Sequence, residues 1–371
     1  MPLYLGLISG TSMDGIDAVL LAVDPDRLAI RAAHHRDWPG ELLVQLRDAA
    51  EHPESSGLVL LGALDVAAGI EFAAAAATLL AEAGIEPGAV RAIGSHGQTV
   101  CHAPHGDLPF TLQIGDPNVV AERLGIDVVA DFRRRDLAAG GQGAPLTPAF
   151  HAAAFASSDE CRAVVNIGGI ANVTLLARDG GVRGCDAGPG NCLLDAWSRR
   201  CVDQPFDQQG AWAATGTVHG PLLERLLAEP YFARTEPKST GRELFSDAWL
   251  DRQLAAFKLP AKDVQATLSE LTVRTIAAAI RSTAADPRWR VERVLICGGG
   301  AFNPGLMHGL AAALPGVRVG STAALGMAPE HVEGAAFAWL AHRHVCALPG
   351  NVPAVTGARH AVKLGALYPG R

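Results

Sequence analysis

The feature of this sequence that most limits its fold is a short pattern that occurs twice, about half a chain apart. Residues 5–21 contain an apolar strand, a polar glycine-containing turn and a second apolar strand, which is typical of a β-hairpin. Residues 164–176 repeat this order, with Gly168 and Gly169 in the turn. Because internal repeats indicate duplicated architecture, we predict an α/β chain of two duplicated lobes, each directing one hairpin turn at a shared cleft.

The first turn has the composition of a phosphate-binding loop. Gly10 and Gly15 allow positive φ and the close approach of a ligand. The hydroxyls of Thr11 and Ser12 lie beside backbone N–H groups, which together suit phosphate oxygens. Asp14 would repel phosphate unless a cation lay between them, so the turn also predicts Mg²⁺, held directly or through water. An ordinary polar hairpin turn is the alternative for this stretch taken alone.

A third glycine-rich turn follows the predicted strand at residues 291–296. Gly298, Gly299 and Gly300 lead into a helix that begins near Asn303. A strand, a glycine turn and a helix N-terminus in succession are a common way to approach a nucleotide. The pattern is not G-x-G-x-x-G, and the chain contains no G-x-x-x-x-G-K-[ST], so both the Rossmann and the P-loop interpretations fail.

Polar side chains at predicted strand ends suggest substrate contacts. A strand at residues 90–95 would present His96 and Gln98 at its carboxyl end, where open α/β sheets bind ligands. Arg133 follows another short strand and is suited to fork onto an anionic group. The alternatives are a structural histidine at position 96 and a solvated run of arginines at residues 133–135.

Two acids are candidates for the chemistry. Asp186 ends a predicted strand at residues 182–185 and precedes a helix, so it is either a catalytic group or a helix N-cap. Glu333 lies, with Glu330, in the first turn of a helix predicted to begin near residue 326. Acids at such a position also stabilise the helix dipole, which is the alternative for both.

The composition excludes several classes of protein. With 371 residues, 49% of them hydrophobic and 19% charged, the chain can bury two sizeable cores. A net charge of −7 and only four lysines argue against a nucleic-acid surface. The apolar run at residues 72–81 is too short to span a bilayer, so we expect no membrane association. Seven scattered cysteines without a Cys-x-x-Cys pair predict reduced thiols in a cytoplasmic protein, not a zinc site.

Taken together, the motifs resemble those of the anhydro-N-acetylmuramic acid kinase family, within the sugar kinase, Hsp70 and actin ATPase superfamily. The resemblance covers nearly the whole chain, and its one noted departure is Glu333-Gly334 where the family has a Glu-Ala pair. The matching blocks are Ser9-Gly10-Thr11-Ser12-Met13-Asp14-Gly15, Ser95-His96-Gly97-Gln98-Thr99, Gln113-Ile114-Gly115-Asp116-Pro117, Asp131-Phe132-Arg133, Gly140-Gly141-Gln142-Gly143-Ala144-Pro145-Leu146, Asn166-Ile167-Gly168-Gly169-Ile170-Ala171-Asn172 and Asp186-Ala187-Gly188-Pro189-Gly190-Asn191.

The resemblance implies a fold and a reaction. The fold would be two actin-like (ribonuclease H-like) lobes around a central cleft, which we divide into residues 1–137 plus 345–371 and residues 138–344. The reaction would be the ATP-dependent opening of 1,6-anhydro-N-acetylmuramic acid by water with phosphorylation of O6, giving N-acetylmuramic acid 6-phosphate and ADP in peptidoglycan recycling. Asp186 would be the general base, and Glu333 would help to place the water.

The resemblance also suggests which residues bind the ligands. His96, Gln98 and Arg133 would contact the sugar, and residues 238–243 resemble a family loop on the substrate side, although the sequence gives this loop no role. We also expect a homodimer. The residues expected to hold ATP and Mg²⁺ are Gly10, Thr11, Ser12, Met13, Asp14, Gly15, Ile16, Asp17, Gly168, Gly169, Gly298, Gly299, Gly300 and Asn303.

Two other functions are consistent with the same motifs. An ordinary sugar kinase would use Asp186 to deprotonate the sugar hydroxyl itself, and it would not require an intact anhydro ring. A protein of the Hsp70 or actin type would use ATP to drive a conformational switch or a filament. Such proteins carry a substrate-binding domain or large surface insertions, and 371 residues leave no room for the former.

Overall fold

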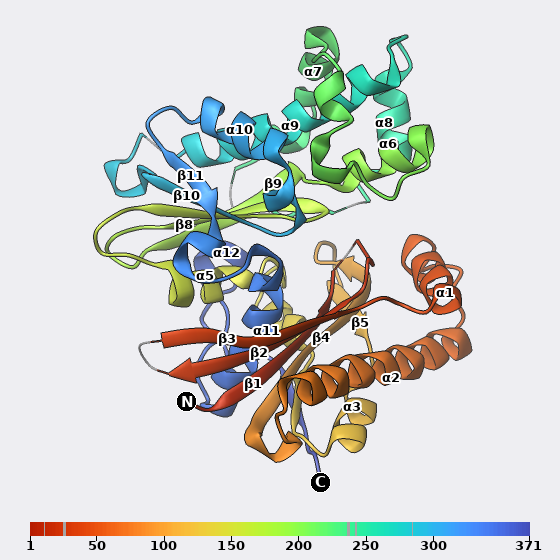
Figure 1. Ribbon diagram of the computed structural model, residues 1–371, viewed down its shortest axis with the longest axis vertical. Coiled ribbons are helices and arrows are strands. Elements are labelled where there is room, and N and C mark those ends of the chain that lie inside the picture. Colours follow the sequence, from red (N-terminus) through yellow and green to blue (C-terminus); the bar gives the residue numbers. More distant parts are fainter. Residues whose placement is uncertain (11, 25–26, 236–237, 242, 284) are drawn as a thin grey trace. The chain divides into compact units, whose positions relative to one another are not determined.

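The computed structural model describes the chain except for residues 11, 25–26, 236–237, 242 and 284 (Figure 1). Thr11 of the predicted phosphate turn therefore lies outside the described residues. The described chain divides into two compact units. The first contains Met1–Phe150 and His331–Arg371, and the second contains His151–Glu330.

The sheet of the first unit is built around the predicted N-terminal hairpin. Strand β1 (Leu3–Ser9) pairs antiparallel with β2 (Ile16–Asp24), which pairs antiparallel with β3 (Arg27–Arg36). On its other side β1 is parallel to β4 (Val90–Ala103), and β4 is parallel to β6 (Val128–Ala130). Antiparallel partners complete the sheet: β5 (Phe110–Ile114) on β4, and β12 (Ala366–Tyr368) on β6.

The sheet of the second unit repeats this topology. Strand β7 (Arg162–Ile167) pairs antiparallel with β8 (Ile170–Leu176), and β8 pairs antiparallel with β9 (Val182–Pro189). On the other side β7 is parallel to β10 (Arg293–Cys297), which is parallel to β11 (Arg318–Ser321). The order β9-β8-β7-β10-β11 matches β3-β2-β1-β4-β6 in sequence and in direction. The predicted duplicated α/β fold is therefore confirmed.

The two faces of the first sheet are covered by different helices. Alternate side chains of β1, among them Leu5 and Leu7, pack into a core with α1 (Gly40–Glu51) and α2 (Leu58–Ala83). The opposite face of β1 contacts α11 (Val332–Val345) at Gly6. A Cβ at Gly6 would collide with the Gly334 carbonyl oxygen and lie 2.6 Å from the Ala338 nitrogen. Glycine is required here because two backbones touch.

The other helices are connectors or cover the second sheet. Helices α9 (Ala261–Arg281) and α10 (Pro304–Ala313) pack against the second sheet in one core. A separate aromatic core is surrounded by α6 (Cys192–Val202), α7 (Gly220–Leu227) and α8 (Asp247–Leu254). Helix α3 begins as predicted, with Asp116 accepting a hydrogen bond of 2.8 Å from the Asn118 N–H and Pro117 at the first position. Helix α3 spans Pro117–Leu124, and the remaining helices are α4 (Phe132–Ala138), α5 (Thr147–Phe155) and α12 (Pro353–Thr356).

Helix α2 extends well beyond the apolar run at residues 72–81. It is the one helix among the described residues whose length and composition would suit a membrane span. Its buried residues, such as Phe72 and Leu79, belong to the core of the first unit. Its acids are also engaged, because Asp65 accepts a hydrogen bond from the Gly115 N–H at 2.7 Å and Glu71 pairs with Arg36. These contacts attach one side of α2 to the first unit.

The boundaries between the units differ from the prediction. We expected the first lobe to end at residue 137 and to resume at residue 345, but the structure divides the chain after residues 150 and 330. The reason is tertiary packing, since α11 contacts β1, β2 and β4 of the first sheet. No feature of the helix sequence itself identifies which sheet it covers.

The fully buried carboxylate of Asp136 binds the glycine-rich segment that follows α4. Asp136 accepts hydrogen bonds from the Gly143 N–H at 2.8 Å, the Asn351 side-chain amide at 2.7 Å and the Thr356 hydroxyl at 2.8 Å. A buried charge is tolerated when donors surround it in this way. Asp136 therefore joins the segment near residue 143 to the segment around α12.

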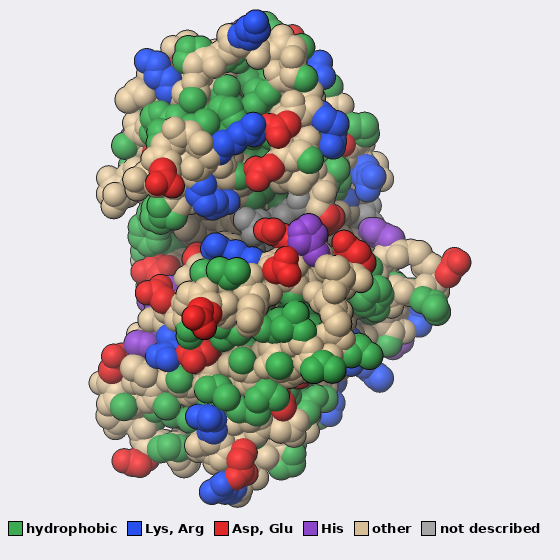
Figure 2. Space-filling model, turned by 90° about the vertical axis from the view of Figure 1, so that its right-hand side faces the viewer, with side chains coloured by type: hydrophobic (Ala, Val, Ile, Leu, Met, Phe, Trp, Pro, Cys, Tyr) green, Lys and Arg blue, Asp and Glu red, His purple; other side chains and the backbone are tan. Residues whose placement is uncertain are grey.

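Acidic and basic side chains are mixed over the face that Figure 2 shows. Together with the net charge of −7, this mixing gives a polyanion no continuous basic surface on that face.

Candidate functional site

The turn between β1 and β2 has an accessible side and a buried side. Ser12 donates a hydrogen bond to the exposed Asp14 carboxylate at 2.8 Å. Met13 and Ile16, in contrast, are buried in the core of the first unit. The Met13 N–H donates to the Gly10 carbonyl at 3.1 Å. Met13 and Ile16 thus support the turn, and the polar atoms lie on its accessible side.

A histidine of the neighbouring strand engages the end of this hairpin. His35 Nδ1 lies 2.7 Å from Asp17 Oδ1, and its Nε2 lies 3.6 Å from Asp37. The hydrogen bond with Asp17 is the main reason why the pKa of His35 is raised. A Cβ at Gly15 would collide with the His35 ring, so Gly15 permits this approach. His35 was not predicted as a site residue, and the signal that could have found it is its place opposite Asp17 on the paired strand.

We predicted His96 and Gln98 at the carboxyl end of a strand, but both lie inside β4. Strand β4 continues to Ala103 because β5 pairs with its second half. Gln98 is fully buried, and its amide donates to the Gly10 carbonyl at 3.4 Å and to the Thr99 carbonyl at 3.1 Å. The structure therefore brings Gln98 to the first turn.

His96 and Arg133 form a pair. Arg133 Nε donates to His96 Nε2 at 3.0 Å, and the other ring nitrogen of His96 lies 2.8 Å from the Gly97 carbonyl. Because the guanidinium only donates, His96 Nε2 accepts and Nδ1 carries the proton. Burial, followed by the charge of Arg133, lowers the pKa of His96 well below its usual value, so the ring is neutral. Arg133 also donates to the Gly143 carbonyl at 2.8 Å, which fixes the guanidinium from a second side.

Asp186 lies within β9, and the expectation that it ends a strand at the head of a helix is wrong. The strand continues to Pro189, and α6 begins at Cys192 after Asn191. Asp186 is therefore not the N-cap of α6. Its side chain is 7% exposed, and its Oδ2 accepts a hydrogen bond from the Thr240 N–H at 3.0 Å.

The two glycine turns of the second unit lie beside each other. Parallel pairing of β7 with β10 places Asn166 opposite Cys297, so the turns that follow these strands share one edge of the sheet. Gly298 has φ of 75°, and a Cβ there would lie 2.8 Å from the Ile167 carbonyl oxygen. The structure thus brings Gly168 and Gly169 to Gly298, Gly299 and Gly300.

The remaining predicted residues belong to helix starts. Asn303 caps α10, since its side chain accepts hydrogen bonds from the Gly305 and Leu306 N–H groups at 3.0 and 3.2 Å. Glu333 lies in the first turn of α11, which begins at Val332 after a short 3₁₀ turn (Pro329–His331) and not near residue 326. Asp186 belongs to the second unit and Glu333 to the first.

Comparison with known proteins identifies the family. The sequence model of anhydro-N-acetylmuramic acid kinase matches residues 2–370. The chain belongs to the anhydro-N-acetylmuramic acid kinase family.

Individual members of the anhydro-N-acetylmuramic acid kinase family align over their whole length. The kinase of Shewanella halifaxensis is 50% identical over 368 residues, which cover 99% of this chain and 98% of that relative. The kinase of Pseudomonas paraeruginosa is 52% identical over 374 residues, which cover 100% and 99%. The predicted family is therefore confirmed, and the chain is an enzyme of the kinase class.

A solved structure with a similar chain path is component A of (R)-2-hydroxyglutaryl-CoA dehydratase from Acidaminococcus fermentans. It aligns with a TM-score of 0.47 and 14% identity over 90% of this chain and 95% of that one. This likeness is too distant to bear on function.

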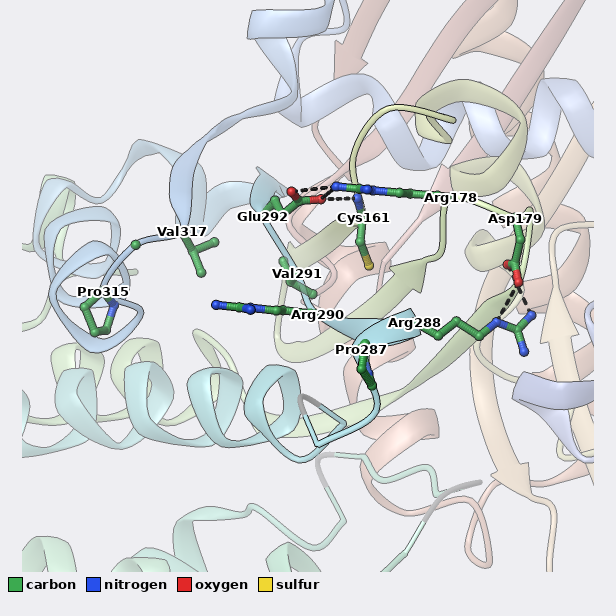
Figure 3. A pocket seen from close by; sticks show the side chains of 11 residues that line it. Cys161, Arg178, Asp179, Pro287, Arg288, Arg290, Val291, Glu292, Pro315 and Val317 are labelled. Atoms are coloured by element: carbon green, nitrogen blue, oxygen red, sulfur yellow. Dashed lines mark hydrogen bonds and ion pairs between the residues drawn. The ribbon is translucent and has the colours of Figure 1, made fainter.

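A cavity in the second unit contains none of the predicted site residues. It has a volume of about 620 Å³, and its lining includes Cys161, Arg178 and Arg290 (Figure 3). Two ion pairs form between lining residues of this cavity, Arg178 with Glu292 and Arg288 with Asp179. Cys161 precedes β7 and Glu292 precedes β10, so the cavity lies at the amino ends of these strands. The glycine turns lie at the carboxyl ends, where α/β sheets bind ligands.

Proposed function

We propose that this kinase carries out the reaction of its family with Asp186 as the general base. The reaction opens 1,6-anhydro-N-acetylmuramic acid with water and transfers the γ-phosphoryl group of ATP to O6, yielding N-acetylmuramic acid 6-phosphate and ADP. The observation that carries the proposal is the backbone N–H of Thr240, which donates to the Asp186 carboxylate. Such a donor favours the ionised carboxylate, and a general base must be ionised to accept a proton.

The reaction needs one proton acceptor, and we assign this role to Asp186. Asp186 accepts a proton from water as the water oxygen attacks C1 of the sugar. The bond between C1 and O6 breaks, and the freed O6 attacks the γ-phosphorus of ATP while ADP leaves. Glu333 helps to orient the attacking water.

Arg133 is the residue that we assign to the acidic group of the sugar. Its guanidinium is fixed by His96 and by the Gly143 carbonyl, which reduces the conformational freedom lost when a carboxylate binds. His96 then acts as the support of Arg133, and Gln98 contributes beside the first turn.

The predicted ATP-binding residues are suited to a metal ion that takes most of its ligands from the phosphates of ATP. No cluster of three or more metal-ligating side chains occurs among the described residues. The turn instead offers the exposed Asp14 carboxylate and the Ser12 hydroxyl, and Mg²⁺ is commonly bound by one or two carboxylates plus phosphates and water. We assign the metal to Asp14, and we assign ATP to the turn at residues 10–17 and to the glycine turns at residues 168–169 and 298–300.

The experiment that tests the reaction follows an isotope. With ATP, the anhydro sugar and ¹⁸O-labelled water, we expect mass spectrometry to find one labelled oxygen at C1 of a 6-phosphate product. The label enters because water supplies the new anomeric hydroxyl. An ordinary hydroxyl kinase would leave the anhydro ring intact and phosphorylate a free hydroxyl without taking up this label, and that result would replace the proposed reaction with simple phosphorylation.

A second test concerns Arg133. We expect Arg133→Met to raise the KM for the anhydro sugar on the order of tenfold or more, because a charge-assisted hydrogen bond to the substrate is lost. The KM for ATP should change little. Arg134→Met is the control, since Arg134 lies on the same helix but pairs with Asp131 and is largely exposed. Equal KM values for the sugar in the two variants would remove Arg133 from the sugar site.

We also propose that the enzyme acts in the cytoplasm as a homodimer. Its use of ATP and its scattered thiols favour a reducing, ATP-containing compartment. Light scattering of the purified protein measures the number of subunits.

A further inference from the structure

A single stretch of chain engages Asp186 at three separate atoms. The Tyr231 hydroxyl donates to the Asp186 carbonyl at 2.8 Å. The Asp186 N–H donates to the Lys238 carbonyl at 3.2 Å, and the Thr240 N–H donates to the Asp186 carboxylate at 3.0 Å. Main chain and side chain of Asp186 are thus both held by the same segment.

The need for this support follows from the position of β9. It is the last strand of its sheet, and the outer edge of such a strand presents backbone groups that have no strand partner. At Asp186 the Lys238 carbonyl serves as that partner. The pairing of β8 with β9 is also irregular between Ala171 and Asn172, where Asn172 lies opposite Asp186. Irregularities of this kind redirect a side chain and commonly occur near active sites.

Tyr231 is itself held by an aromatic core. Its side chain is 1% exposed, and its ring contacts Phe245 edge-on with centroids 5.9 Å apart. Phe232 packs against the backbone of the same strand, since a Cβ at Gly188 would lie 2.7 Å from the Phe232 ring. The Tyr231 hydroxyl that contacts Asp186 is therefore carried by a ring that is tightly packed among other aromatic side chains.

The charged and titratable groups near Asp186 leave the Tyr231 hydroxyl as a hydrogen-bond donor. Burial is the main cause that raises the pKa of Tyr231, so the phenol stays protonated and remains a donor. Cys185 and Arg234 also interact electrostatically with Tyr231. Lys238 Nζ lies 5.0 Å from the centre of the Tyr231 ring and donates to the Phe232 carbonyl at 3.3 Å.

We propose that Thr240 and Tyr231 are positioning residues for the general base. The Thr240 N–H orients the Asp186 carboxylate and favours its ionised form, and the Tyr231 hydroxyl fixes the backbone from which the carboxylate projects. This inference rests on the proposed function, in which Asp186 accepts the proton of water. It gives a role to the segment near residue 240, for which the sequence alone supplied none.

The test uses a substitution that removes one N–H group. Thr240→Pro lacks the donor, whereas Thr240→Ala keeps it and loses only the side chain. We expect Thr240→Pro to lower kcat on the order of tenfold, with KM for ATP nearly unchanged, and Thr240→Ala to retain kcat within about twofold. The acid limb of the kcat–pH profile should move to higher pH in Thr240→Pro only, because a carboxylate that loses an N–H donor holds its proton more tightly.

Tyr231→Phe provides a second variant that keeps the ring and removes the hydroxyl. We expect its kcat to fall severalfold while nucleotide binding, measured by calorimetry, stays the same. Normal kcat in both Thr240→Pro and Tyr231→Phe would overturn the inference, and so would equal losses in Thr240→Pro and Thr240→Ala. If Thr240→Pro does not fold, normal kcat in Tyr231→Phe alone overturns it. Failure of the proposed function is separate, because it would appear as normal turnover in Asp186→Asn.

Discussion

We expect Asp186→Asn to lower turnover by at least about 10²-fold, with ATP binding nearly unchanged. The substitution keeps the size of the side chain and an oxygen that can accept the Thr240 hydrogen bond, but it removes the basic oxygen. Positioned general bases commonly contribute on the order of 10² to 10⁴ in rate, which sets the expected loss. Single-turnover kinetics with saturating ATP and sugar would measure the chemical step directly.

Asp203→Asn is a suitable control for this variant. Asp203 is exposed and has φ of 52°, a conformation that asparagine also adopts readily, so both turnover and stability should be preserved. Calorimetry with ATP checks that Asp186→Asn still binds nucleotide. If Asp186→Asn turns over at nearly the wild-type rate, Asp186 has a structural role on β9 and another group must accept the proton.

We expect Gly94→Ala to destabilise the protein by about 3 kcal/mol or more. Gly94 lies in the middle of β4, and a Cβ there would collide with the Phe337 carbonyl oxygen, lie 2.8 Å from its carbonyl carbon and lie 3.1 Å from Ala341 Cβ. Neither backbone can move away easily, because β4 pairs with β1 and β6 while α11 packs along its length. Differential scanning calorimetry should show a melting temperature roughly 10 °C lower.

Gly62→Ala is the matched control for the same substitution. Gly62 lies in α2, is exposed, and a Cβ there would meet no atom within 4 Å. Alanine is favoured over glycine in a helix by up to about 1 kcal/mol, so this variant should be slightly more stable than the wild type. Equal melting temperatures for Gly94→Ala and Gly62→Ala would mean that α11 does not contact β4 as closely as described.

Features that depend on neighbouring residues were predictable from the sequence. The hairpin of β1 and β2 and its copy in β7 and β8 follow from apolar runs around glycine turns. The end of α2 was also predictable, because a glycine follows it and glycine commonly ends helices; Gly84 indeed adopts φ of 64°. In these cases the local chemistry of the chain decides the structure.

Features that depend on distant segments were not predictable in this way. Strand β4 is longer than expected because β5 supplies partners for its second half. Helix α11 belongs to the first unit because small residues such as Gly6 allow it to approach that sheet.

The surroundings of the proposed base were missed for a similar reason. Tyr231 and Thr240 lie 45 and 54 residues from Asp186, and neither belongs to a motif that indicates a contact with it. The pairing of His35 with Asp17 was detectable in principle, since both lie on strands of one meander, but it required the register of β2 and β3.

The buried contacts of Asp136 have a consequence for the order in which the chain folds during synthesis. Two of its partners, Asn351 and Thr356, lie 215 and 220 residues later in the chain. The second unit is one continuous segment and has all its partners once residue 330 has left the ribosome, whereas the first unit must wait for α11 and β12. Until then, the glycine-lined face of β1 and β4 lacks the helix that covers it, so we expect the first unit to complete its fold after the second.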